Sequence, residues 1–82
     1  MDAVAEADCE AAAKAVLNIA ELTANPDAPR RRERALDAAA CARAAAVAAR
    51  KIADASPTSQ AQRRARIAEN CANAAELQAS LL

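Results

Sequence analysis

The stretch Leu36–Arg50 constrains the fold most, because it is apolar on almost every side of a helix. Its sequence is LDAAACARAAAVAAR, with Cys41 near the middle. A helix with so little polar surface has to be covered on more than one side. The segments before and after it are the only cover within these 82 residues. We therefore expect both to pack against it.

The composition favours helices throughout the chain. Twenty-nine residues are alanine, and there is no glycine, aromatic residue or histidine. Alanine and most of the remaining residues are strong helix formers, so the sequence predicts an all-α fold. A domain of this size buries only about 60% of its unfolded surface, and each alanine methyl adds little apolar area. These two limits favour very close helix packing and self-association.

Two proline-containing turns divide the chain into three predicted helices. Pro26 disfavours helical geometry in the residue before it, which ends the first helix. Asp27 is the expected cap of the second helix. Ser56 followed by Pro57 has the pattern of a cap and a proline at the first helical position of the third. The predicted helices cover residues 2–24, 28–54 and 57–80.

The predicted architecture is an antiparallel up-down-up three-helix bundle in one domain, residues 1–82, because short connections make consecutive helices neighbours. The third helix carries a seam of alanines at spacings of three and four, which lets helix axes come closer than the usual 8–10 Å or so. A second copy of the chain is one way to complete such a bundle. The seam consists of Ala61, Ala65, Ala68, Ala72, Ala75 and Ala79.

The charge balance argues against several kinds of partner. Eleven acidic and eleven basic residues give no net charge, so no general attraction to nucleic acid or an anionic membrane is expected. Base stacking needs aromatic side chains, which are absent. No apolar run approaches the roughly 18 residues of a membrane span. The N-terminus is acidic, unlike a secretory signal, so we expect a cytoplasmic protein.

An enzyme is the least favoured class. The chain has no histidine and no glycine-rich phosphate loop. A thiol without an evident base is weak evidence for a nucleophile. We therefore expect no catalytic activity and no catalytic residues.

The run Arg30–Arg34, RRRER, lies at the start of the second predicted helix. One interpretation is a solvated surface patch. The other is a site for an anion or an acidic partner, and spacing does not decide between them.

Three cysteines, one in each predicted helix, are the candidate site residues: Cys9, Cys41 and Cys71. Counted from the two turns at ~1.5 Å per residue, all three lie within about 3 Å of one level. An odd number of cysteines without a signal favours free thiols or a metal site over disulfides. We therefore predict a metal centre of three thiols. Arg43 and Arg64 are the nearby cations that would favour thiolates.

The predicted metal is Cu(I). Soft thiolates select Cu(I), whereas structural zinc usually takes four protein ligands and no histidine is present to complete such a set. The alternative is that the cysteines are inert and stand in for alanine as small hydrophobic residues. Height along a helix does not decide between these hypotheses, since it leaves the direction of each thiol open.

The segment Ile67–Gln78, IAENCANAAELQ, resembles the CAExCxxCAExC segment of the bacterial cysteine-rich copper storage proteins. These are four-helix bundles whose interior cysteines bind many Cu(I) ions. Cys71 stands on a family cysteine, and Ile67, Ala74 and Gln78 replace three others. Residues 25–57 are similar to the family's second helix and its borders. The positions of the first helix that match the family's metal-facing residues are Cys9, Ala12, Val16, Ile19 and Thr23.

The resemblance implies Cu(I) binding at low stoichiometry. Most metal-facing positions are apolar, which excludes a high-capacity copper store. The chain also ends before a fourth helix, which implies completion by a second copy or a reduced or designed scaffold. The absence of glycine and aromatics, with alanine seams and idealised caps, is typical of designed proteins. The second hypothesis is a non-catalytic structural or homo-oligomerisation module with inert cysteines.

Overall fold

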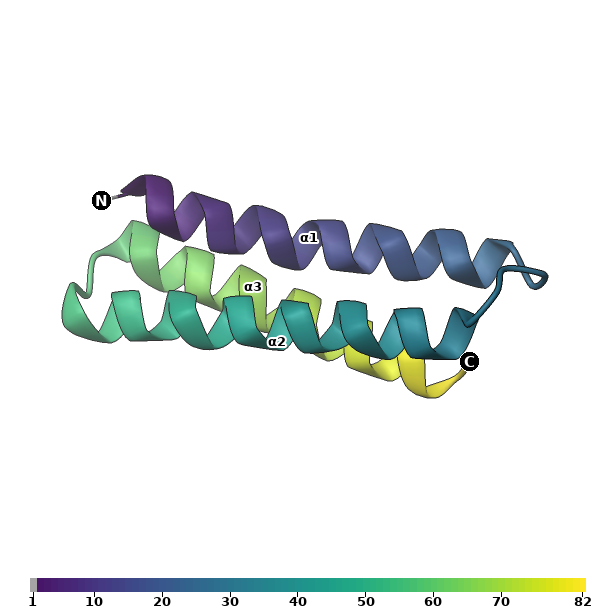
Figure 1. The fold of residues 1–82 in the computed structure, drawn as a ribbon. Helices are drawn as coiled ribbons and strands as arrows, with labels where there is room; N and C mark the ends of the chain where they lie inside the picture. Colours follow the sequence, from purple (N-terminus) through teal and green to yellow (C-terminus); the bar gives the residue numbers. More distant parts are fainter. Residues whose placement is uncertain (1) are drawn as a thin grey trace.

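The protein is an all-α three-helix bundle, which confirms the predicted fold class (Figure 1). The computed structural model describes the backbone of residues 2–82 and the side chains of residues 9–82. Its helices are α1 (Asp2–Ala24), α2 (Arg31–Ala55) and α3 (Ser59–Ser80). They run up, down and up, so that α1 and α3 are parallel to each other and antiparallel to α2.

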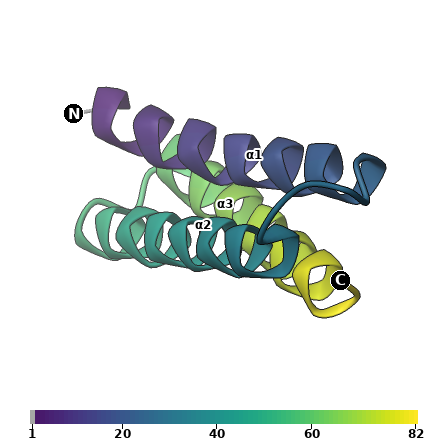
Figure 2. The same cartoon turned by 45° about the vertical axis from the view of Figure 1, so that its right-hand side comes forward.

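The three helices form an elongated bundle of 44 × 19 × 14 Å. In Figures 1 and 2, α1 lies above the pair formed by α2 and α3 and runs along its length. The contact between α2 and α3 is the most extensive and that between α1 and α3 the least. The apolar middle helix is therefore the one that both neighbours pack against, as its sequence predicts.

The core consists almost entirely of methyl groups. Among residues 9–82, every buried residue except Ile19 and Leu22 is an alanine, and no polar or charged residue is buried. The whole predicted seam of α3, from Ala61 to Ala79, is buried. Since each methyl offers little area, the apolar contribution to stability comes from many close backbone approaches.

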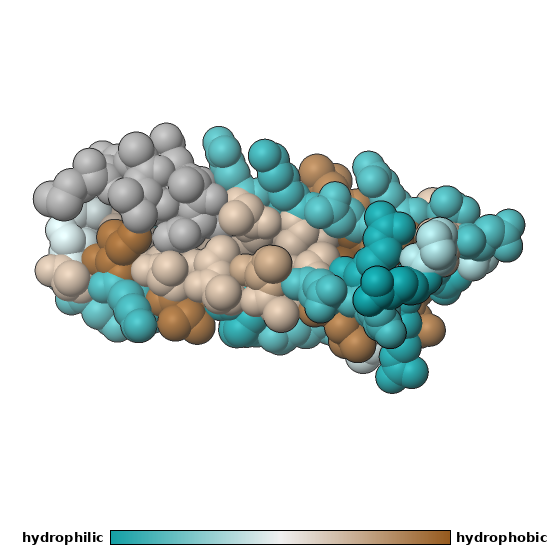
Figure 3. Space-filling view, in the orientation of Figure 1, coloured by the Kyte–Doolittle hydropathy of each residue, from teal (hydrophilic) through white to brown (hydrophobic). Residues whose placement is uncertain are grey.

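Most of the larger apolar side chains lie outside this core. Within the part of the chain whose side chains are described, Ile19 is the one large residue with less than 2% exposure. Figure 3 shows apolar residues spread across the middle of the surface over α1 and α2. Six larger residues are at least 42% exposed: Leu17, Leu36, Val47, Ile67, Leu77 and Leu81.

Helix α2 begins three residues later than predicted. Ala28 precedes Pro29 and is therefore disfavoured in a helix, by the same rule that ends α1 before Pro26. The residue in the N-cap position is Arg30, not the expected Asp27. Arg30 has φ 54° and ψ 36°, the left-handed conformation, and no side chain caps the helix there.

Helix α3 also begins later than predicted, and its cap is a different residue. The N–H of Ser56 donates to the carbonyl of Ile52 at 2.9 Å, so Ser56 closes α2 and does not open α3. Thr58 is the N-cap, and its Oγ1 accepts a hydrogen bond from the N–H of Ala61 at 3.0 Å. Pro57 therefore lies in the connection, before the helix.

We expect the substitution Ile19→Ala to lower the free energy of unfolding by about 2–5 kcal/mol, because it empties a buried site. Leu17 is 63% exposed on the same helix, so the control Leu17→Ala is expected to stay within about 0.5 kcal/mol of the parent. Urea unfolding followed by far-ultraviolet circular dichroism measures both. Equal losses for the two variants would contradict the observed core.

The corrected cap gives a second stability prediction. Thr58→Ala removes the acceptor for the N–H of Ala61 and is expected to cost about 1 kcal/mol. Ser56→Ala is expected to cost much less, because the contact of Ser56 that orders the turn is made by its backbone. Thermal unfolding of the two variants compares them directly, and the reverse order would restore Ser56 as the cap.

Candidate metal centre

Cys9 lies in an open groove between α1 and α3. The thiol is half-buried and is not in a disulfide. The groove has a volume of about 490 Å³. Its α3 wall carries two arginines and an isoleucine, so it is apolar at one end and cationic at the other. The lining residues are Cys9, Glu10, Ala13, Gln60, Arg63, Arg64 and Ile67.

Cys71 lies on the same side of α3 as this groove. It follows Ile67 by four residues, which places it one helical turn further along the same edge. Its side chain is half-buried and packs against the alanine core. Cys71 therefore lies on the edge of α3 that borders the α1–α3 groove, one turn beyond the residues that line it.

The pKa of the Cys9 thiol reflects this neighbourhood. Burial raises the pKa of Cys9 above its ordinary value, and the thiolate of Cys71 raises it further by like-charge repulsion. The guanidinium of Arg64 opposes both effects, and Glu10 adds a small rise. This repulsion means that Cys71 lies within electrostatic range of Cys9. Arg64 is thus the predicted cation that does act on a thiol.

Cys41 lies elsewhere on the bundle. It is exposed and follows Arg34 and Ala38 by seven and three residues, on one edge of α2. Both of those residues line a different groove, of about 300 Å³, which lies between α1 and α2. Cys41 therefore lies on the same edge of α2 as two residues that line the α1–α2 groove.

No group of three or more histidine, cysteine, aspartate or glutamate side chains suited to a metal ion occurs among the described residues. Of the three predicted ligands, Cys71 lies within electrostatic range of Cys9, and Cys41 is exposed on another edge of α2. These residues fit a metal held by two thiolates better than one held by three. A shared site for all three thiols stays a prediction.

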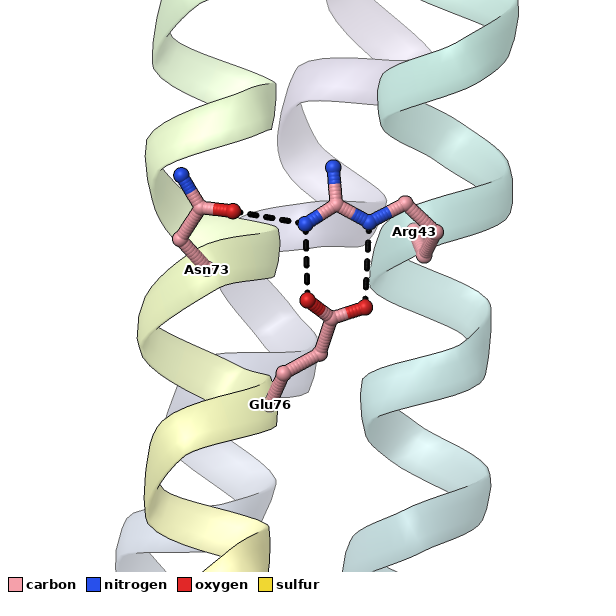
Figure 4. A network of polar contacts seen from close by, with 3 residues as sticks. All are labelled: Arg43, Asn73 and Glu76. Carbon is pink, nitrogen blue, oxygen red and sulfur yellow. Dashed lines mark hydrogen bonds and ion pairs between the residues drawn. The ribbon is translucent and has the colours of Figure 1, made fainter.

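Arg43, the other predicted cation, is hydrogen-bonded to two side chains of α3. Its Nη2 donates to Glu76 Oε1 at 2.7 Å and to Asn73 Oδ1 at 2.6 Å, and its Nε donates to Glu76 Oε2 at 3.0 Å (Figure 4). These bonds lower the pKa of Glu76 and raise that of Arg43. A guanidinium held in this way faces α3 and not the α1–α3 groove.

A second pair of the same kind joins α2 to α3. Arg50 Nη2 donates to Glu69 Oε1 at 2.5 Å, and Arg50 Nε donates to Glu69 Oε2 at 3.3 Å. The hydrogen bonds lower the pKa of Glu69 and raise that of Arg50. The sequence analysis did not predict either pair. The signal was present, since Arg43 and Arg50 are seven apart on one helix and the two glutamates are seven apart on the next.

The basic run at the start of α2 is mostly exposed. Arg30 pairs with Glu33 within the run, with Arg30 Nη2 at 2.6 Å from Glu33 Oε2. Arg31 lines a groove near the end of α3, and Arg34 lines the groove between α1 and α2. The arginines thus point toward different grooves, and a common anion site stays an open alternative.

No family model, curated protein or solved structure matches the chain. The resemblance to the copper storage proteins therefore stays an expectation from the sequence. Among the described residues, no helix has the length and apolar character that crossing a bilayer requires.

The thiol pair gives a prediction for cysteine reactivity. Cys71→Ala removes the like charge beside Cys9, so the pKa of Cys9 is expected to fall and its alkylation at a fixed pH to become faster. The control Cys41→Ala is expected to leave the pH profile of Cys9 unchanged. The rates come from mass spectrometry of peptides after timed alkylation with iodoacetamide across a pH series. If both variants left the profile unchanged, the two thiols would not be neighbours.

Proposed function

We propose that the chain binds one Cu(I) ion, or another soft metal ion, through the thiolates of Cys9 and Cys71. The observation that carries this proposal is the nearness of the two thiols: Cys71 lies close enough to Cys9 for its charge to raise the pKa of the Cys9 thiol. Thiolate ligands favour Cu(I) over harder ions, and Cu(I) accepts as few as two of them. Zinc is less suited, because structural zinc sites usually have four protein ligands.

The surroundings of the pair support this assignment. Both side chains are half-buried, which limits access to competing ligands without closing the site. The Arg64 guanidinium stabilises the Cys9 thiolate and would partly offset the negative charge of a two-thiolate site. Because burial and the Cys71 thiolate both favour the protonated form of Cys9, metal binding has to displace protons. Affinity is therefore expected to rise with pH.

Cys41 takes no part in this proposal. It is exposed on the edge of α2 that faces the other groove, and a two-thiolate site does not need it. The expected capacity is one ion per chain.

A second candidate function is a structural or homo-oligomerisation module with inert cysteines. The observation that favours it is the distribution of apolar side chains. The core holds alanine, whereas Leu17, Leu36 and Leu77 are among the large residues left at the surface. Where such residues form a contiguous patch, the patch commonly marks a protein–protein contact.

The first proposal is tested by anaerobic titration with Cu(I), following the thiolate-to-copper charge-transfer band in the near ultraviolet. The chain has no aromatic residues to absorb there. The parent and Cys41→Ala are expected to saturate at one equivalent. Cys9→Ala and Cys71→Ala each lose a ligand, so the band is expected to disappear or the affinity to fall at least roughly tenfold. A band that survives in both, or that Cys41→Ala abolishes, would contradict the assignment.

A further inference from the structure

The outer face of α2 is an apolar surface that neither neighbouring helix covers. We define it by Leu36, Ala40, Ala44 and Val47, which recur at spacings of four, four and three and are all exposed. Leu36 and Val47 are each 48% exposed. In Figure 3 apolar residues extend across the front of the molecule, where α2 lies.

This face is separate from the two faces of α2 that the bundle uses. Arg43 and Arg50 lie along the edge that meets α3. Arg34 and Ala38 lie along the edge that meets α1. The helix that the sequence marks as needing cover on more than one side is therefore covered on two sides and open on a third.

Two charged residues of opposite sign flank the apolar centre of the outer face. Asp37 lies seven residues before Ala44 and Lys51 seven residues after it, and both are exposed. Among the described side chains, neither takes part in an ion pair. Positions seven apart fall on nearly the same side of a helix. The face therefore has one acidic end and one basic end at equal distances from its middle.

We propose that two copies of the chain pair through the outer faces of α2, antiparallel and related by a two-fold axis at Ala44. This inference rests on the second proposed function, self-association. The axis places Asp37 of each copy opposite Lys51 of the other, about 10.5 Å on either side of the centre. It also places Ala40 within one residue, about 1.5 Å, of the level of Val47 of the second copy. Ala44 meets its own counterpart, as in any isologous contact.

A second copy fits this face better than an unrelated protein, because the face is complementary to itself. The charge changes sign about Ala44. When an identical helix lies antiparallel against this face, the acidic end of each copy therefore meets the basic end of the other. Alanine at the centre allows the helix axes to come closer than the usual 8–10 Å or so. One helix from each copy makes an interface smaller than the standard size of about 1,600 Å², so we expect a dissociation constant in the micromolar range.

Charge reversal tests the pairing. Asp37→Lys sets two lysines against each other at both ends of the interface, and Lys51→Asp sets two aspartates. Each variant alone is expected to raise the dimer dissociation constant by at least roughly tenfold. Mixed in equal amounts, the two variants are expected to form a heterodimer of nearly parental affinity, since opposite charges then meet at both ends. Sedimentation velocity across a concentration series measures all three samples.

The matched control is Glu21→Lys, which changes the net charge by the same amount at an exposed position of α1. It is expected to leave the dissociation constant unchanged. A parent chain that stays monomeric at millimolar concentration would overturn self-association itself. A parent that associates regardless of Asp37→Lys, or variants that fail to recover on mixing, would overturn the α2 interface alone.

Discussion

The structure depends on how closely backbones approach when their contacts are made by methyl groups. Except for Ile19 and Leu22, the buried side chains of residues 9–82 are all alanine. Such a core offers little shape to distinguish one register from another, because successive alanines are nearly interchangeable. Register therefore has to be fixed by other contacts. Each pair of helices also buries little apolar area. The stability of the bundle therefore depends on α2 packing against both of its neighbours.

Between α2 and α3 the register is fixed by two arginine–glutamate pairs. Arg43 with Glu76 and Arg50 with Glu69 lie two helical turns apart and share a single antiparallel alignment. A shift of one helix by one turn would break both bidentate contacts together. Bidentate arginine–carboxylate pairs are geometrically specific. The α1–α3 contact is the least extensive, and it is there that the coupled thiols lie.

The sequence was sufficient for the number, order and type of the helices, because strong helix formers fill the three segments and prolines stand between them. The two helix starts were predicted less well, since each depends on local geometry. Arg30 takes a left-handed conformation, which its side chain gives no reason to expect. Thr58, two residues after Ser56, has equal capping chemistry, and only the backbone path selects it. Heights along the bundle could be counted for the thiols, whereas their directions depend on how α1 is rotated against α3.

The alanine core also shapes the response of the fold to temperature. Unfolding exposes less apolar area per residue when methyl groups replace branched side chains, and the heat capacity of unfolding follows that area. A small heat-capacity change flattens the dependence of stability on temperature. The free energy of unfolding is then expected to fall only gradually on cooling as well as on warming. Its maximum is modest and extends over a wide range of temperature.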